Sequence, residues 1–239
     1  TLFPYRSEEH RSVKNSNVCS SDLFVNMLFA AKESGVKKFI YASSSSVYGD
    51  DSTFPKTENK TGKLLSPYAV SKHTNEKYAA VFSELYNLQT IGFRYFNVFG
   101  ERQNPEGAYA AVIPKFIASL IKNQSPSIYG TGNNTRDFTY VGNVVRANEL
   151  AIKNSINPKS IVMNIAFGGT VSVNDIFKEI SFHTNKEQIL PTYLPERKGE
   201  IKDSYANISL AQQTINFEPI IPLGEGLKKT TDWFLQNYK

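Results

Sequence analysis

Two rhythms of hydrophobic and polar positions alternate along this chain, one of helical period and one of short apolar runs typical of buried strands. The first clear pattern is an apolar stripe at helical spacing that a glycine ends. The apolar residues of the stripe are Phe24, Met27, Leu28 and Ala31, and Gly35 ends the helix. An apolar run at residues 38–42 follows and predicts a strand. A helix that leads into a buried strand is the unit from which parallel α/β sheets are built.

The rest of the chain continues this alternation. Ser66 is a good N-cap and Pro67 suits the first helical position, so a helix is expected over residues 67–87. Ser172 predicts another capped helix start further along. Strands are expected at residues 90–95, 127–130 and 161–166, and helices at residues 117–121, 144–153 and 224–238. The pattern therefore predicts an α/β protein.

Composition narrows the class of protein. The chain has 239 residues, of which 40% are hydrophobic, enough for one substantial core or for one core with a small lobe. It contains no run of about eighteen apolar residues, so no membrane span is expected. The net charge of +5 comes from scattered lysines and favours an anionic small molecule over nucleic acid.

Cysteine and histidine usage adds two expectations. The one cysteine, Cys19, excludes an internal disulfide framework and is typical of a reducing compartment such as the cytoplasm. The chain has 3 histidines and no Cys/His cluster at metal-ligand spacing, so no metal site is expected.

Tyr68 and Lys72 are the first candidate for chemistry. They are four residues apart, so both side chains project from one face of the helix predicted at residues 67–87. A phenol titrates near pH 10, and a nearby ammonium lowers its pKa so that the pair can act as general acid and base. The alternative is that Tyr68 packs against the protein and Lys72 is a solvated surface residue.

The serines before this helix favour the chemical interpretation. Residues 43–46 are all serine and follow the strand at residues 38–42, and the carboxyl end of a parallel strand is where α/β sheets bind ligands. Three motifs then stand in order, at residues 44–49, 66–72 and 94–100. Together they resemble the extended short-chain dehydrogenase/reductase family, and within it the nucleotide-sugar 4-epimerases.

The resemblance implies a fold and a domain organisation. Residues 24–110 would form the C-terminal part of an NAD-binding Rossmann domain, a doubly wound parallel sheet, with strand and helix contributions from later segments. Residues 111–239 would mainly form a smaller α/β lobe that binds a UDP-sugar. The family often dimerises through a four-helix bundle, which here implies a homodimer through the helices at residues 24–34 and 68–86.

The resemblance also implies roles for individual residues. Ser44, Tyr68 and Lys72 would be catalytic, and Lys72 would also hold the nicotinamide ribose. The residues implied at the cofactor NAD are Tyr68, Lys72, Tyr95 and Phe96. Those implied at the UDP-sugar are Ser45, Ser46, Asn97, Gln103, Ala111, Val112, Lys115, Tyr129, Arg136, Arg197 and Ser204. Two alternatives stay open: Tyr95 and Phe96 are core aromatics, and Arg136 with Asp137 forms a structural ion pair.

The sequence departs from the family pattern in its first part. No Gly-rich turn of the kind that receives a dinucleotide pyrophosphate occurs in the chain. We therefore expect the first part of the Rossmann domain to be absent. Residues 1–23 show no sustained periodicity, and two interpretations stay open: the segment is foreign to the fold, or it is a divergent helix start.

The expected function is NAD-dependent 4-epimerisation of a UDP-sugar through a 4-keto intermediate, an isomerase reaction. The expected substrates are UDP-N-acetylglucosamine and UDP-N-acetylgalactosamine, and also UDP-glucose and UDP-galactose. Dehydratases of the family need an Asp-Glu pair where this chain has Ser45 and Ser46, which cannot do that acid–base work. The alternatives are a UDP-N-acetyl-uronic acid 4-epimerase, and an inactive fragment that binds sugar nucleotide without NAD.

Overall fold

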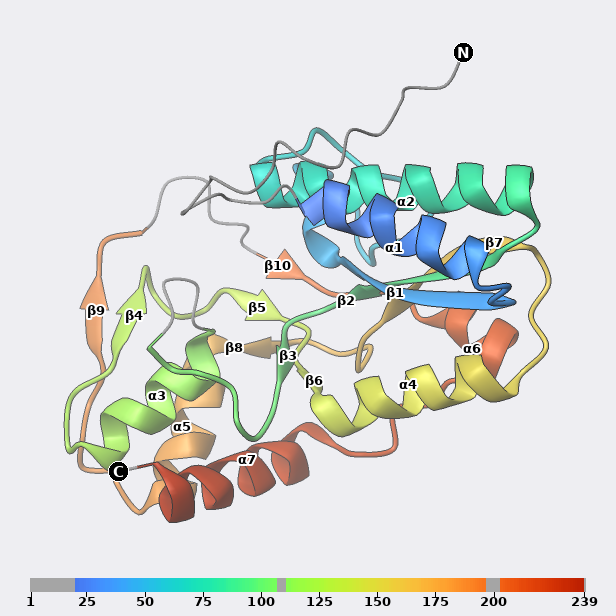
Figure 1. The fold of residues 1–239 in the computed structure, drawn as a ribbon. Coiled ribbons are helices and arrows are strands. Elements are labelled where there is room, and N and C mark those ends of the chain that lie inside the picture. Colours follow the sequence, from blue (N-terminus) through green and yellow to red (C-terminus); the bar gives the residue numbers. More distant parts are fainter. Residues whose placement is uncertain (1–19, 107–110, 197–202, 239) are drawn as a thin grey trace, which may run out of the picture.

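The computed structural model describes residues 20–106, 111–196 and 203–238, and Figure 1 shows their arrangement. The helices are α1 (Ser20–Glu33), α2 (Pro67–Tyr86), α3 (Val112–Ile121), α4 (Val141–Lys153), α5 (Val173–Thr184), α6 (Ser209–Ile215) and α7 (Leu223–Asn237), and η1 (Ser45–Tyr48) is a short 3-10 helix. The strands are β1 (Lys38–Ser44), β2 (Gln89–Tyr95), β3 (Val98–Phe99), β4 (Ser127–Tyr129), β5 (Thr135–Arg136), β6 (Thr139–Tyr140), β7 (Ser160–Ile165), β8 (Val171–Ser172), β9 (Thr192–Leu194) and β10 (Asp203–Ser204).

The main sheet consists of β1, β2 and β7 in that order, and both pairings are parallel. Helices α1 and α2 cover one face of this sheet, and α4 and α6 cover the other (Figure 1). Alternate residues of β2 serve the two faces, as the strand period requires. Ile91 and Phe93 pack in the core against α4 and α6, whereas the Thr90 hydroxyl donates to the Ala79 carbonyl of α2. This confirms the predicted parallel α/β sheet with helices on both faces.

Local sequence chemistry explains the ends of α2. The Ser66 side chain accepts a hydrogen bond from the backbone N–H of Ala69 at 3.1 Å, and Pro67 occupies the first turn. Asn87 ends the helix in the left-handed conformation at φ 55°. Ser172 likewise caps α5 by accepting from the N–H of Asp175. Both predicted caps are therefore confirmed.

The first helix differs from the prediction in its start and in one of its faces. It begins at Ser20, four residues before the predicted start at Phe24. Gly35 follows it at φ 66°, as expected of a helix-ending glycine. Leu28 and Ala31 are buried, but Met27 is 52% exposed and lies outside the core that the stripe predicted. The reason is geometric, because a two-helix layer buries only the narrow side that faces the sheet.

A second, smaller layer of helices and short strands forms the other lobe (Figure 1). Its core is built from α3, α5 and α7, and the packing is dominated by Phe116, Phe177 and Phe234. Strands β4 and β9 pair in parallel beside these helices, while β10, β5 and β8 form a small mixed sheet. In α7, Leu227, Thr231 and Phe234 are buried, whereas Leu235 is exposed.

The two lobes do not divide the chain at a single residue. Beyond residue 111, β7, α4 and α6 all belong to the layers of the main sheet, where Ala147, Met163 and Ile215 share one core. After β2 the chain enters the smaller lobe and returns to the main sheet with α4 and β7. It then enters the smaller lobe a second time and returns with α6. Among the described helices, none is long and apolar enough to cross a membrane.

Candidate active site

Two of the predicted catalytic residues, Tyr68 and Lys72, lie on α2 near the carboxyl end of β1. The Lys72 ammonium donates to the Ala42 carbonyl at 3.0 Å, two residues before Ser44. The same ammonium lies 5.7 Å from the centroid of the Tyr68 ring. Tyr68 is 55% exposed, so its phenol is open to a ligand. Burial lowers the pKa of Lys72, as expected of an ammonium held against the protein.

The three serines beyond this point form the strand tip, which we define as Ser44, Ser45 and Ser46. The Ser44 hydroxyl accepts a hydrogen bond from the N–H of Ser46 at 3.2 Å and caps η1. The Ser46 hydroxyl is buried, and no partner for it lies within the described ranges. A buried hydroxyl without a partner is uncommon. The strand tip therefore offers hydrogen-bonding capacity at the end of the sheet where parallel α/β proteins bind ligands.

Tyr95 and Phe96 lie at the corresponding end of β2, beside the strand tip. The Tyr95 hydroxyl accepts from the Asn148 amide of α4 at 2.9 Å, and burial raises the pKa of this phenol. Phe96 is fully buried in a cluster with Tyr48 and Ala206. Both side chains thus pack within the protein, as the core-aromatic alternative expects. A contact of either with NAD stays a prediction.

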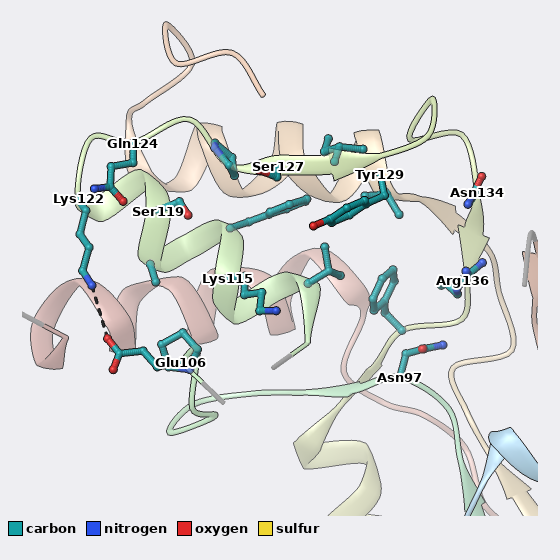
Figure 2. Close-up of a pocket in the computed structure, with 18 of the residues that line it drawn as sticks. Asn97, Glu106, Lys115, Ser119, Lys122, Gln124, Ser127, Tyr129, Asn134 and Arg136 are labelled. Carbon is teal, nitrogen blue, oxygen red and sulfur yellow. Dashed lines mark ion pairs between the residues drawn. The ribbon is translucent and has the colours of Figure 1, made fainter. Parts of the chain in front are cut away.

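The smaller lobe contains a cleft of about 450 Å³, which Figure 2 shows in close-up. Five of the residues predicted to bind substrate line it: Asn97, Val112, Lys115, Tyr129 and Arg136. Lys122 lines it too and pairs with Glu106 at 3.6 Å (Figure 2). Cationic side chains from α3 and β5 therefore surround one cavity, a setting that attracts anions.

The structure describes three further residues of the predicted substrate set, Ala111, Gln103 and Ser204. Ala111 lines a second cavity of about 140 Å³ that shares Asn97 and Val112 with the first. The Gln103 amide donates to the Val98 carbonyl at 3.2 Å, and its oxygen is buried without a partner among the described residues. Ser204 pairs with Arg136 in the register of β10 and β5. Arg197 lies outside the described residues.

Asn97 connects the cleft to the strand tip. Ser44 and Tyr95 are partners in the parallel register of β1 and β2. Asn97 follows Tyr95 by two residues and so lies just beyond the level of Ser44. Its backbone is left-handed at φ 33°, and its side-chain amide donates to the Asp137 carbonyl at 3.0 Å. Asn97 therefore lines the cleft just beyond the sheet edge that ends in the strand tip.

Asp137 is a structural centre that the sequence reasoning did not find. Its carboxylate accepts backbone hydrogen bonds from Phe167 at 3.0 Å, Gly168 at 3.1 Å and Ala206 at 3.3 Å. Burial raises its pKa to about 6, and these N–H groups oppose the rise. Asp137 thus joins three separate chain segments beside the cleft. The adjacent glycines at residues 168 and 169 were the only local hint of such an acceptor.

Comparison with known proteins places this geometry in a family. The model of the NAD dependent epimerase/dehydratase family matches residues 9–166. A putative UDP-glucose 4-epimerase of Methanocaldococcus jannaschii is 39% identical over 214 residues, which make up 89% of this chain and 68% of that relative. The chain belongs to the NAD dependent epimerase/dehydratase family. The fold and the family that the three motifs predicted are thereby confirmed.

Two solved structures of the same family show similar folds. The UDP-N-acetylglucosamine 4-epimerase of Methanobrevibacter ruminantium, in complex with UDP-N-acetylmuramic acid, superposes with a TM-score of 0.85 at 39% identity, over 90% of this chain and 68% of that one. The UDP-glucuronic acid 4-epimerase of Bacillus cereus, in complex with UDP-glucuronic acid and NAD, gives 0.80 at 30% identity, over 91% and 67%. This chain therefore spans about two thirds of the length of these relatives.

Asp137 leads to a prediction about stability. In Asp137→Asn one carboxylate oxygen becomes an NH2 group, which cannot accept from the backbone N–H groups that face it. We expect the free energy of unfolding to fall by about 3 kcal/mol, since each buried donor left without an acceptor costs about 1–3 kcal/mol. Urea unfolding at neutral pH measures the loss. The matched control is Asp50→Asn, because exposed Asp50 accepts one N–H, from Lys63; an equally small loss in both variants would contradict this role.

Proposed function

We propose that this chain carries the catalytic and substrate-binding residues of an NAD-dependent UDP-sugar 4-epimerase. The observation that carries the proposal is the position of the Lys72 ammonium, which donates to the Ala42 carbonyl two residues before Ser44 and lies 5.7 Å from the Tyr68 ring centroid. The relatives named above as epimerases of UDP-glucose, UDP-N-acetylglucosamine and UDP-glucuronic acid support the reaction type. The single cysteine supports a reducing location such as the cytoplasm.

Tyr68 and Ser44 are the residues proposed to move the proton of the sugar. Tyr68, whose ring lies beside the Lys72 ammonium, takes the proton of the sugar 4-hydroxyl and returns it after the 4-keto sugar has turned over. Ser44 hydrogen-bonds the same oxygen and assists the transfer. Ser45 and Ser46 hydrogen-bond the sugar and supply no acid or base for dehydration.

The cofactor expected by the family fits one part of this chain. The Lys72 ammonium has three N–H donors, and its bond to the Ala42 carbonyl leaves others for the hydroxyls of a nicotinamide ribose. Tyr68 and Lys72 would therefore hold the nicotinamide end of NAD, which when bound accepts and returns the hydride of C4. The sequence contains no Gly-rich turn for the pyrophosphate end.

The cleft in the smaller lobe would hold the UDP part. Arg136 is proposed to contact the diphosphate, because a guanidinium fork matches phosphate oxygens and stays charged. Arg197 is its proposed partner from the other segment. Lys115 adds positive charge to the same wall, and Tyr129 with the backbone of Ala111 and Val112 would enclose the base.

The sugar proposed first is an N-acetylhexosamine, with glucose and galactose also accepted. Ser204 is the reason, since it is small and lies level with Arg136 in the β10–β5 register, where a larger side chain would take up room beside the sugar. Gln103, whose amide donates to the Val98 carbonyl, is proposed as a further contact. A UDP-N-acetyl-uronic acid is the nearest alternative substrate, and the glucuronate epimerases among the relatives favour it.

A second candidate function is binding of a sugar nucleotide without NAD. Two observations favour it: the missing Gly-rich turn, and a cleft built wholly from residues of this chain. Calorimetric titrations with NAD and with UDP separate the two functions. Binding of both supports the epimerase, whereas UDP binding without NAD binding supports the second candidate.

We also propose that two copies associate through α1 and α2. These helices lie side by side on the outside of the main sheet (Figure 1). Their solvent side carries exposed apolar residues at helical spacing on α2, with Leu23 and Met27 on α1. The α2 members are Tyr78, Val81 and Leu85. Several exposed apolar side chains on two neighbouring helices are a feature expected of an interface.

The first prediction concerns the proposed base. Tyr68→Phe removes the phenol and leaves the ring, so we expect interconversion of UDP-N-acetylglucosamine and UDP-N-acetylgalactosamine to fall at least about a thousandfold. UDP affinity should change less than about twofold, because the cleft does not use Tyr68. Product analysis by NMR and UDP calorimetry measure the two quantities. Turnover that persists in Tyr68→Phe would remove Tyr68 from the mechanism.

The second prediction concerns selectivity. Ser204→Tyr fills the space beside the sugar, and we expect kcat/KM for the N-acetyl substrate to fall about tenfold or more relative to UDP-glucose, an effect of at least about 1.4 kcal/mol. Competition between the two substrates in one reaction measures the ratio directly. Ser204→Ala is the control and should leave the ratio unchanged. An equal loss for both sugars would show that Ser204 does not select.

The third prediction concerns assembly. Leu85 is 67% exposed on the proposed interface side of α2. Leu85→Glu places a charge there, and we expect it to convert the dimer to a monomer in analytical ultracentrifugation. Leu190→Glu is the matched control, because Leu190 is 73% exposed in the smaller lobe. A dimer that survives Leu85→Glu, or one that Leu190→Glu disrupts, would place the interface elsewhere.

A further inference from the structure

Three buried polar residues stand side by side across the main sheet, and we call Ser43, Arg94 and Asn164 the polar row. The parallel register pairs Ser43 with Arg94 and Arg94 with Asn164. Their exposures are 3%, 4% and 0%. They occupy the level just before Ser44 and Tyr95, so the polar row lies directly beneath the strand tip. Polar side chains buried this deeply are found where their hydrogen bonds are satisfied.

Glu76 of α2 is the partner of the first two members. Its Oε1 accepts from the Ser43 hydroxyl at 2.5 Å and from Arg94 Nε at 2.9 Å, while its Oε2 accepts from Arg94 Nη2 at 2.8 Å. The guanidinium and the carboxylate therefore meet in a two-pronged fork, which fixes direction as well as distance. His73, one turn earlier, also faces this carboxylate, with Nδ1 4.0 Å from Oε2.

Because Glu76 lies on α2, its contacts with Ser43 and Arg94 affect how this helix sits on the sheet. Glu76 follows Lys72 by four residues and Tyr68 by eight, so the three side chains share one helix face. Lys72 contacts β1 at Ala42, and Glu76 contacts it at Ser43, the next residue. Two directional contacts at adjacent levels of one strand define both the rotation of α2 and its height above the sheet.

The remaining contacts of the polar row hold the surroundings of the strand tip. Arg94 Nη1 donates to the Glu58 carbonyl at 3.0 Å, and its guanidinium stacks 4.9 Å from the centroid of the Tyr48 ring. The Asn164 amide donates to the Lys56 carbonyl at 3.0 Å and to the Asn207 carbonyl at 3.1 Å. The loop between η1 and α2 is thus fixed by the same row that fixes α2.

We infer that Glu76, acting with Ser43 and Arg94, is a positioning residue that sets where Tyr68 and Lys72 stand above the strand tip. Apolar side chains of similar volume would fill this space at least as stably, since burying a carboxylate and a guanidinium carries a large desolvation cost. What apolar packing does not supply is direction. The inference rests on the proposed function for its catalytic meaning, but the placement of Lys72 is measurable without turnover.

The test replaces both charges at once. The paired variant Glu76→Leu with Arg94→Met keeps the net charge and a similar volume, and such replacements tend to retain stability. Lysines labelled at Cε report the pKa of each ammonium by NMR titration, and Lys72→Arg assigns the Lys72 signal. Burial now lowers the pKa of Lys72. If α2 loses its position, Lys72 returns toward water and its pKa should rise toward that of a solvated ammonium.

Two further variants make the result specific. Ser43→Ala removes one hydrogen bond to Glu76 but keeps the ion pair, so it should fold and give a smaller shift in the same direction. Ile215→Ala destabilises the core on the opposite face of the sheet without touching the polar row, and it should leave the Lys72 titration unchanged. An unchanged Lys72 in the paired variant, or an equal shift in Ile215→Ala, would overturn the inference.

Kinetics then separate this inference from the proposed function. If the wild-type chain turns over UDP-sugar, the paired variant should lower kcat about tenfold or more while KM changes less than about threefold, because the cleft is untouched. If the wild-type chain does not turn over, the proposed function fails, and the Lys72 titration still decides whether Glu76 positions α2.

Discussion

The ion pair between Glu76 and Arg94 is the constraint on which the arrangement of this site depends. Both groups are almost inaccessible, and neither charge could remain buried without the other. The fork between them, completed by the Ser43 hydroxyl, leaves α2 little freedom to rotate or slide over β1 and β2. A helix that only packed on the sheet through apolar contacts would have several neighbouring positions of similar energy.

Strand β2 and the two residues after it connect this constraint to the cleft of the smaller lobe. Arg94 faces α2, while Tyr95 faces the opposite side and contacts α4. Phe96 is then buried in the core, and Asn97 turns into the left-handed conformation and lines the cleft. Because successive side chains of a strand point to opposite faces, one short segment holds the residue that binds Glu76, the residues that pack in the core and the residue that lines the cleft. A shift in β2 would therefore be felt at the strand tip and at the cleft together.

The sequence predicted what depends on local chemistry. The N-cap at Ser66, the helix-ending Gly35 and the apolar strands were found because their signals lie within a few residues. The partners of Glu76 and Asp137 were not found, since they come from segments far away in the chain. The exposure of Met27 was also missed, because periodicity gives the apolar face but not how wide a strip the neighbouring elements cover.

Contacts between distant segments also join the proposed catalytic residues to the segment proposed to bind the sugar. Lys56, in the loop before α2, donates its N–H to the Tyr205 carbonyl and accepts from the Asn207 N–H, both at 2.9 Å. The Phe54 and Tyr205 rings stack with centroids 6.2 Å apart. Tyr205 directly follows Ser204, and the polar row holds the other side of this loop through Asn164. The segment proposed to read the sugar is therefore attached to the framework that holds the proposed base. The proposed selectivity and the proposed catalysis would therefore share one support, whose attachments include directional hydrogen bonds of Lys56 and Asn164.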